Sequence, residues 1–509
     1  MKLSALIKGL TPKVAATLDP EVSNICFDSR KVSKGCCFVA QVGTKVDGHE
    51  YIESAIADGA SAIICQVMPK NLHKEVAYIQ VENSDVALGI MADNFYDHPS
   101  SKLKLIGITG TNGKTTCCNL ILEVLAANGY DVLNNKAGSN IDAGLASSLI
   151  ADATLGGRVK KKLALFEVDE RSSPKVYPYI RPDYAVCTNL FRDSIYRNAH
   201  PEFIFSVIDK YVPDGTHMIL NADDPISSRL AINNPRTYFS IARMETDLPE
   251  CVNIIQDMRV CPYCHHRLEY EYVRYHQIGK AKCPSCGYAT PEGDFVASPD
   301  PDAQTLTVHT PDGDEVYPMV SGSKFNNYNQ ITAISLLRTM GLSAESIADA
   351  FRSMDIVRSR HSETVCRGRQ IITNMTKGQN PVACSCVFDY VRAESGVKEV
   401  IIMLDDLGFS KSSEIMTWIY DTEFEFLNDG SIVRLVVCGV RCFDYRLRLL
   451  LAGVPDEKIV CVENTPDAPK QLLLDGTDKI FILHDLTQPE MTATVCDGVV
   501  TELERRYAE

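Results

Sequence analysis

The residues that most directly suggest chemistry form a glycine-rich loop at positions 106–116, which reads IGITGTNGKTT. The loop follows an apolar, β-branched run and precedes a stretch with helical spacing, so it is expected to join a strand to a helix. Gly110 and Gly113 would let backbone N–H groups close on phosphate oxygens, and the helix N-terminus adds positive potential. Lys114 would reach the β- and γ-phosphates and the Thr115 hydroxyl would bind Mg²⁺, although the first glycine of the usual phosphate-loop spacing is missing.

A second group of chemically competent residues is formed by two C-x₂-C pairs, Cys261 with Cys264 and Cys283 with Cys286. Residues 265–282 separate the pairs, and this spacer of 18 residues is typical of a four-thiolate zinc ribbon. Each pair would direct two thiolates at one metal ion. Because four thiolates complete a tetrahedral site, the nearby histidines are interpreted as surface residues; they are His265, His266 and His276.

The first two-thirds of the chain supply the elements that would position these groups. Residues 1–100 have the pattern of a small α/β unit. From residue 102 onwards, strand candidates separated by helical stretches predict a parallel, doubly wound sheet. These strand candidates are Leu103–Thr109, Lys162–Val168, Tyr184–Thr188 and His217–Leu220. The cysteine-rich segment at 258–292 is expected to be an insertion in this alternation.

The last third of the chain has a similar alternation. Helices are expected at Ser335–Leu342 and Ala344–Phe351, before a second series of apolar strands. The strands of this series are expected at Glu399–Leu404, Ile432–Cys438, Lys458–Val462 and Lys479–Leu483. The chain therefore carries more than one α/β sheet, as its length of 509 residues also suggests.

Composition narrows the class of protein and its compartment. Hydrophobic residues make up 45% and charged residues 23%, as in an ordinary globular protein, and the net charge of −15 disfavours a surface devoted to nucleic-acid phosphates. No signal peptide and no run of 18 apolar residues is recognisable, so we expect a cytoplasmic protein without a transmembrane segment. Its 19 cysteines are then expected to be reduced, with fifteen of them outside the predicted metal site.

The segment 109–116 resembles the ATP loop of the Mur ligase family, whose members join an amine to a carboxylate through an acyl-phosphate. Other family marks follow in order: Glu167 resembles the second Mg²⁺ ligand, Asn221–Pro225 the NxDD segment, and Gly322–Asn329 the G-x-x-N-x-x-N stretch. The resemblance implies ATP and Mg²⁺ as cofactors, with Thr115 and Glu167 as magnesium ligands and Lys114 and Glu167 as catalytic residues. It implies these nucleotide-binding residues: Gly110, Thr111, Asn112, Gly113, Lys114, Thr115, Thr116, Asn221, Asp224 and Asn329.

The same resemblance implies the α/β architecture of three Mur-type domains. They are an N-terminal domain at 1–100, a central P-loop-type ATPase domain at 101–318 with the zinc ribbon at 258–292, and a Rossmann-like C-terminal domain at 319–509. Residues 24–66 are similar to the UDP-MurNAc-binding domain of the MurE branch, in which Ser29 and Arg30 would contact the nucleotide sugar.

From residue 135 on, the chain is more similar to the MurT branch, the ligase subunit of lipid II isoglutaminyl synthase. The matching segments are Lys136–Asn140, Phe166–Glu170, Thr188–Asp193 and Trp418–Glu425, and MurT proteins carry a similar ribbon. This branch implies amidation of the D-glutamate carboxylate of a peptidoglycan precursor, lipid II or a UDP-MurNAc peptide. The ammonia would come from a separate GatD-like glutamine amidotransferase, whose catalytic site would be completed by Asp421, with Asp405 and Asp406 as alternatives.

Three other interpretations stay open at this point. The chain could be a MurE-like ligase that adds an amino acid to UDP-MurNAc-dipeptide, as its first 117 residues favour. It could be a ligase with another substrate. It could also be a nucleic-acid-binding ATPase that uses the ribbon, because residues 258–287 carry five Arg or Lys against two Glu; the overall acidity and the absence of helicase-like motifs oppose this reading.

Overall fold

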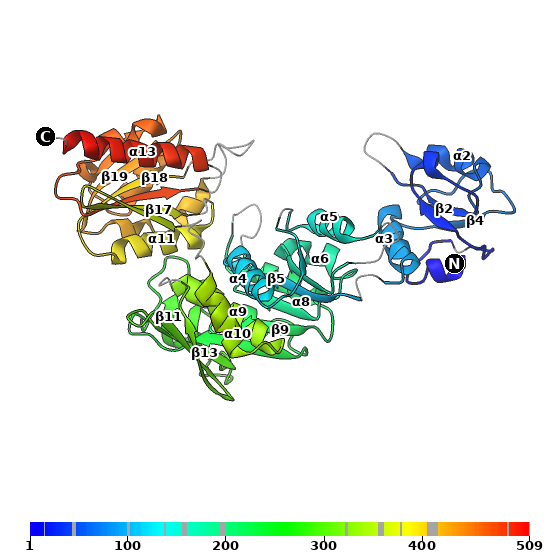
Figure 1. Ribbon diagram of the computed structural model, residues 1–509, viewed down its shortest axis with the longest axis horizontal. Coiled ribbons are helices and arrows are strands. Elements are labelled where there is room, and N and C mark those ends of the chain that lie inside the picture. Colours follow the sequence, from blue (N-terminus) through cyan, green and yellow to red (C-terminus); the bar gives the residue numbers. More distant parts are fainter. Residues whose placement is uncertain are drawn as a thin grey trace. The chain divides into compact units, whose positions relative to one another are not determined.

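The structure is a computed structural model of the chain (Figure 1). The residues that it describes are 1–14, 16–42, 47–98, 102–136, 139–154, 160–193, 200–320, 324–354, 361–376, 379–404, 416–485 and 488–507. Asp405 and Asp406, the alternative partner-facing acids, and the beginning of the 322–329 stretch lie outside these residues. By their contacts the residues form two units: Met1–Ile106, Tyr130–Phe166 and Ser172–Asp183 in the first, and Gly107–Gly129, Glu167–Arg171 and Tyr184–Glu509 in the second.

The N-terminal region of the first unit is built on a parallel sheet in the order β1-β2-β3-β4. Its strands are β1 (Asn24–Cys26), β2 (Cys36–Val39), β3 (Ala62–Cys65) and β4 (Ala77–Gln80). The accompanying helices are α1 (Leu3–Leu6), α2 (Ile52–Ala57) and α3 (Ser84–Phe95). Successive strand residues point to opposite faces, so each face has its own apolar core, with Val39 and Ile64 in one and Phe38 and Ile63 in the other.

A nine-stranded sheet follows, in the order β15-β14-β13-β10-β9-β8-β5-β7-β6. The first six of its strands along the chain are β5 (Lys104–Thr109), β6 (Val132–Asn134), β7 (Leu163–Glu167), β8 (Tyr184–Cys187), β9 (His217–Asn221) and β10 (Arg236–Ile241). The helices between them are α4 (Lys114–Ala127), α5 (Asp142–Asp152), α6 (Ser173–Val176) and α8 (Pro201–Tyr211). The β6–β7, β8–β9 and β9–β10 pairs are parallel, as the alternation of strands and helices predicts.

The far edge of this sheet was not anticipated from the sequence. Strands β13 (Phe295–Asp300), β14 (Thr305–Thr310) and β15 (Gly313–Pro318) form an antiparallel meander beside β10. Helix α9 also begins earlier than the expected 335, because it runs over Lys324–Thr339 and is followed by α10 (Ala344–Ser353). Its first turns are rich in asparagine, which hides the apolar periodicity, yet the Asn327 and Asn329 side chains are buried.

The C-terminal region carries a six-stranded sheet in the order β16-β17-β21-β18-β19-β20, parallel except for the β16–β17 pair. Its strands are β16 (His361–Cys366), β17 (Arg369–Met375), β18 (Lys398–Met403), β19 (Ile432–Cys438), β20 (Ile459–Val462) and β21 (Lys479–His484). Its helices are α11 (Pro381–Ala393), α12 (Cys442–Leu451) and α13 (Pro489–Arg506).

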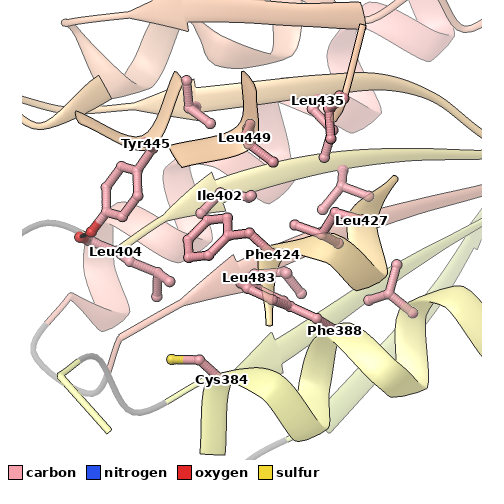
Figure 2. Close-up of a cluster of buried hydrophobic side chains, with 14 of the residues drawn as sticks. Cys384, Phe388, Ile402, Leu404, Phe424, Leu427, Leu435, Tyr445, Leu449 and Leu483 are labelled. Atoms are coloured by element: carbon pink, nitrogen blue, oxygen red, sulfur yellow. Dashed lines mark hydrogen bonds between the residues drawn. The ribbon is translucent and has the colours of Figure 1, made fainter. Parts of the chain in front are cut away.

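Helices cover both faces of this C-terminal sheet, with α11 and α13 on opposite sides (Figure 1). On the α11 side, the Phe424 ring lies 5.0 Å from the Phe388 ring and 6.2 Å from the Tyr445 ring, measured between centroids (Figure 2). These large rings exclude water from one continuous core, which stabilises a rigid α/β layer. Within the residues described, no helix is long and apolar enough to cross a membrane.

Candidate functional site

The glycine-rich loop lies between the end of β5 and the start of α4, so its backbone N–H groups lie at the N-terminus of that helix. Gly110 and Gly113 have φ angles of +119° and +87°, which favour glycine. A Cβ atom at Gly110 would overlap the Thr188 hydroxyl, and one at Gly113 would overlap the side-chain oxygen of Asn329. Both glycines are therefore required by backbone conformation and by close packing.

Lys114, the first residue of α4, forms an ion pair with Glu170 at an Nζ–Oε1 distance of 2.6 Å. The Glu170 side chain is 1% exposed and that of Lys114 is 12% exposed. Burial opposes the charge of Lys114, but Glu170 and the nearby Asp169 and Glu167 outweigh it, so the pKa of Lys114 is raised. The amine is thus kept protonated beside the loop, which suits it to an anionic ligand. The sequence reading assigned Glu170 no role, and only its place in the FEVDE segment could have indicated one.

Thr115 and Glu167, the two predicted magnesium ligands, are adjacent in space. The Thr115 hydroxyl donates to Glu167 Oε2 at 2.9 Å, although 52 residues separate them. Glu167 is the last residue of β7, and Thr115 is in the first turn of α4. Two oxygen ligands of the kind that Mg²⁺ prefers therefore meet beside the phosphate loop. Thr116, the next residue, is half-buried in the same helical turn.

Segment 188–193, which the sequence analysis matched to the MurT branch without giving it a role at the loop, holds the loop in place. The Asn112 N–H donates to Asn189 Oδ1 at 3.0 Å, and the Asn189 amide donates to the Asn112 carbonyl at 3.1 Å. The Thr111 hydroxyl donates to the Phe191 carbonyl at 3.1 Å, and the Phe191 N–H to that hydroxyl at 2.9 Å. The Thr188 hydroxyl also donates to the Asn112 carbonyl, at 2.7 Å. Two of the predicted nucleotide-binding residues are therefore fixed by reciprocal hydrogen bonds.

The remaining predicted nucleotide-binding residues are buried and hydrogen-bonded. The Asn221 amide donates to the Thr188 carbonyl at 3.2 Å, and Asp224 Oδ2 accepts the Leu190 N–H at 2.9 Å. Burial raises the pKa of Asp224, against several hydrogen bonds that lower it. Asn329, on α9, lies against Gly113. Asn329 thus borders the loop, whereas Asn221 and Asp224 contact the 188–193 segment beside it, and direct contact of the three with a nucleotide stays a prediction.

The four cysteines of the two C-x₂-C pairs come together, with all four sulfur atoms within 4.8 Å of one another. The Sγ–Sγ distances are 3.5 Å for Cys261–Cys286 and 3.4 Å for Cys264–Cys283. Tetrahedral zinc with Zn–S bonds of about 2.3 Å needs sulfurs about 3.8 Å apart, so the spacing fits such an ion. Burial opposes ionisation of Cys261, but the backbone N–H groups of Cys264 and Tyr263 lower its pKa to about 7, which favours a thiolate.

The expectation that all three neighbouring histidines lie on the surface is wrong for His276. His265 and His266 are exposed, whereas His276 is 3% exposed. It occupies the turn between β11 (Glu269–Tyr275) and β12 (Ile278–Lys282), where its ring packs edge-on against Phe191 at 5.8 Å. The turn is buried because it inserts beside the 188–193 segment, a long-range contact that residue type cannot reveal.

Asp421, the acid predicted to serve a glutaminase, follows a 3₁₀ turn at Thr417–Tyr420 and is partly exposed. Arg192 Nη1 lies 3.4 Å from Asp421 Oδ2, and Arg192 Nη2 lies 2.6 Å from Asp257 Oδ1. In the first unit, Arg30 is exposed and pairs with Asp28 at 2.9 Å. The structure therefore gives each of these predicted residues an ionic partner.

Three family models match the chain: the Mur ligase catalytic domain at residues 21–96, the Mur ligase middle domain at 108–248 and the MurT ligase C-terminal domain at 378–488. The MurT subunit of lipid II isoglutaminyl synthase (glutamine-hydrolyzing) from Staphylococcus aureus strain COL is 32% identical over 352 residues, which are 69% of this chain and 78% of that protein.

Two further similarities are informative. UDP-N-acetylmuramoyl-L-alanyl-D-glutamate–2,6-diaminopimelate ligase from Bacteroides fragilis is 44% identical over 133 residues, which are 26% of this chain and 27% of that protein. The crystal structure of MurF from Acinetobacter baumannii covers 98% of both chains with a TM-score of 0.58 and 16% identity. The last match shows that the chain has the α/β fold of these ligases, with parallel sheets.

Proposed function

The chain belongs to the Mur ligase family of ATP-dependent ligases, and from that premise we propose that it amidates a peptidoglycan precursor in the manner of the MurT branch. Its substrate would be the D-glutamate carboxylate of the stem peptide in lipid II or a UDP-MurNAc peptide. The amine would be ammonia that a GatD-like glutamine amidotransferase releases.

The observation that carries the proposal is the convergence of Lys114, Thr115 and Glu167 at one helix N-terminus. A protonated amine, a hydroxyl and a carboxylate beside a glycine-rich loop form a site suited to Mg²⁺ and ATP phosphates. The match of residues 378–488 to the MurT C-terminal domain favours this branch over the others.

The mechanism would proceed in two transfers. A carboxylate oxygen of the substrate attacks the γ-phosphorus of ATP, and the bond to ADP breaks. The Lys114 amine would neutralise charge that develops on the phosphoryl oxygens, and Thr115 and Glu167 would hold Mg²⁺, which would supply further positive charge there. Ammonia then attacks the acyl carbon, inorganic phosphate leaves, and the attacking nitrogen loses a proton to solvent, which gives the neutral carboxamide.

The proposal also covers the cysteine site, the domain boundaries and Asp421. The four cysteines would hold a structural zinc ion, which the convergence of their four sulfur atoms supports. The chain would comprise an N-terminal domain at 1–100, a central ATPase domain at 101–318 and a Rossmann-like C-terminal domain at 319–509. Asp421, partly exposed on the C-terminal domain, would face the glutaminase.

A MurE-like ligation is the second candidate, because the diaminopimelate ligase of B. fragilis shares 44% identity over 133 residues. In that case the amine would be an amino acid and the acceptor a UDP-MurNAc-dipeptide. The two candidates share the ATP site and differ in the amine.

The test supplies ammonia directly, so that no partner is needed. Purified chain is incubated with lipid II, MgATP and ammonium chloride, and the product is identified by mass spectrometry alongside ADP release. We expect the amidated precursor from the wild type, and a rate at least about 100-fold lower from Lys114→Met, since the variant loses a charge that stabilises the transition state.

Lys470→Met is the matched control, because Lys470 is an exposed lysine of the C-terminal region and is expected to leave the rate unchanged. Ligation of diaminopimelate to UDP-MurNAc-dipeptide instead would favour the second candidate. If the folded wild type turned over ATP with neither set of substrates, the proposal would be wrong.

A further inference from the structure

The two cysteine pairs are joined by an antiparallel hairpin. We call residues 261–286, which include both pairs, the cysteine hairpin. Strands β11 and β12 pair from Glu269–Lys282, next to the cysteines, to Tyr275–Ile278, next to the turn. Seven residues of strand span about 20 Å, so the turn lies far from the sulfur atoms. The open end would carry the metal ion, and the closed end contacts the loops that surround the nucleotide site.

The first contact of the closed end is made by Gln277. Its Nε2 donates to the Leu190 carbonyl at 2.9 Å, and the residue is 2% exposed. Leu190 lies between Asn189 and Phe191, the two residues whose hydrogen bonds fix Asn112 and Thr111. The residue that Gln277 contacts is therefore the immediate chain neighbour of both residues that hold the phosphate loop.

The second contact is made by Arg274, whose side chain is fully buried. Its Nη1 lies 3.2 Å from Asp223 Oδ2, and its Nη2 lies 2.7 Å from Asp247 Oδ2. The Tyr328 hydroxyl of α9 donates to the same Asp223 oxygen at 2.6 Å. The Gly279 N–H donates to the Asp223 carbonyl at 2.8 Å, so both the backbone and the side chain of Asp223 accept hydrogen bonds.

Asp223 and its neighbours belong to the other edge of the predicted nucleotide site. The Asp223 N–H donates to Asn221 Oδ1 at 3.0 Å, and the Asn221 amide in turn donates to the Thr188 carbonyl. At the open end, the Tyr288 hydroxyl, two residues beyond Cys286, donates to the Pro225 carbonyl at 3.3 Å, so this end contacts the 221–225 segment as well. Buried polar contacts of this kind fix geometry more strictly than apolar packing does, because each requires its partner in place.

We infer that a metal ion bound by the four cysteines stabilises the cysteine hairpin, and that the hairpin in turn positions the nucleotide site. Gln277 and Arg274 are the positioning residues through which it acts. A metal ion at the open end would hold the two strands together, and the turn would hold segments 188–193 and 221–225 in the geometry that binds ATP. The inference rests on the proposed function in one respect, namely that residues 110–116 bind the nucleotide.

The test measures nucleotide affinity, metal content and thermal stability of the full chain together. Gln277→Met keeps the side-chain length but cannot donate to the Leu190 carbonyl. We expect this variant to retain one zinc per chain and to bind a non-hydrolysable ATP analogue with Mg²⁺ about tenfold more weakly, which is the effect of one lost buried hydrogen bond. In turnover, KM for ATP should rise and kcat should change little, whereas loss of folded protein would lower kcat alone.

Glu271→Gln is the matched control, because Glu271 lies on β11 and its side chain is 68% exposed. Its affinity should equal that of the wild type. A metal-free form, made by replacing Cys283 and Cys286 with serine or by chelation, should bind the analogue more weakly than the loaded chain. Adding Gln277→Met to this form should weaken binding no further, since loss of the metal would already release the Gln277 contact.

Wild-type affinity in Gln277→Met would overturn the inference, and so would a metal-free form that stays folded and binds the analogue as tightly as the loaded chain. If the metal-free form does not fold, Gln277→Met decides alone. A wild-type chain that binds no nucleotide would overturn the proposed function together with this inference, which separates the two failures.

Discussion

Replacement of Gly113 by alanine offers a sharp test of the nucleotide site, because helix α4 supplies its own control. Gly113 precedes the helix with φ +87°, and Gly129 follows it with φ +78°. An added Cβ at Gly129 meets nothing within 4 Å, whereas one at Gly113 overlaps the side-chain oxygen of Asn329. The two variants share the backbone strain, and only one of them disturbs the loop.

The expected magnitudes follow from that difference. A left-handed alanine costs about 1–2 kcal/mol, so both variants should lose a similar amount of stability to strain. Gly113→Ala must also displace the Asn329 side chain or the loop. If one charge-assisted hydrogen bond to phosphate is lost, worth about 1.5–3 kcal/mol, ATP affinity falls about 10- to 100-fold.

The assay is titration calorimetry with a non-hydrolysable ATP analogue and Mg²⁺, beside thermal unfolding of each variant. Gly129→Ala should bind as the wild type does and melt at a lower temperature. Gly113→Ala should melt in a similar range and bind weakly or not at all. Equal affinity of Gly113→Ala and the wild type, or an equal loss in both variants, would refute the placement of the nucleotide at this loop.

Three other outcomes are expected. Glu167→Gln should raise the Mg²⁺ concentration needed for half-maximal turnover, because a carboxylate ligand becomes a neutral amide; an unchanged magnesium titration would contradict this role. The raised pKa of Lys114 means that its pairing with Glu170 stabilises the fold below the usual lysine pKa of 10.5 and that this contribution is lost as the pH rises through the higher folded-state value. Denaturation between neutral pH and pH 11 should therefore show a steeper alkaline loss of stability in the wild type than in Glu170→Gln, and parallel curves would count against the pair. Arg274→Met should lower the free energy of unfolding by about 3–5 kcal/mol in urea titrations, because it leaves Asp223 buried without its countercharge. A loss below about 1 kcal/mol would show that the buried ion pairs of Arg274 contribute little to stability in solution.

Much of the fold could be read from local patterns. Runs such as 103–109 and 217–220 are apolar and β-branched, and the structure has β5 and β9 there. The meander β13–β15 was missed although Leu306 and Val308 alternate along β14 and are both buried, and the early start of α9 was missed because its asparagine-rich turns lack an apolar period. The burial of these elements depends on packing between segments distant in the chain, such as β13 beside β10 and α9 against α4.

By itself the sequence determined the groups whose geometry is local. The phosphate loop and the two cysteine pairs are set by spacing over a few residues, because each lies on one turn or one knuckle. Only the tertiary structure decided what holds them: Glu170 beside Lys114, the 188–193 segment around Asn112, and the buried turn that carries His276 and Gln277. These contacts join residues far apart in the chain. Residue type shows that such a side chain can form a hydrogen bond or an ion pair, and folding alone selects its partner.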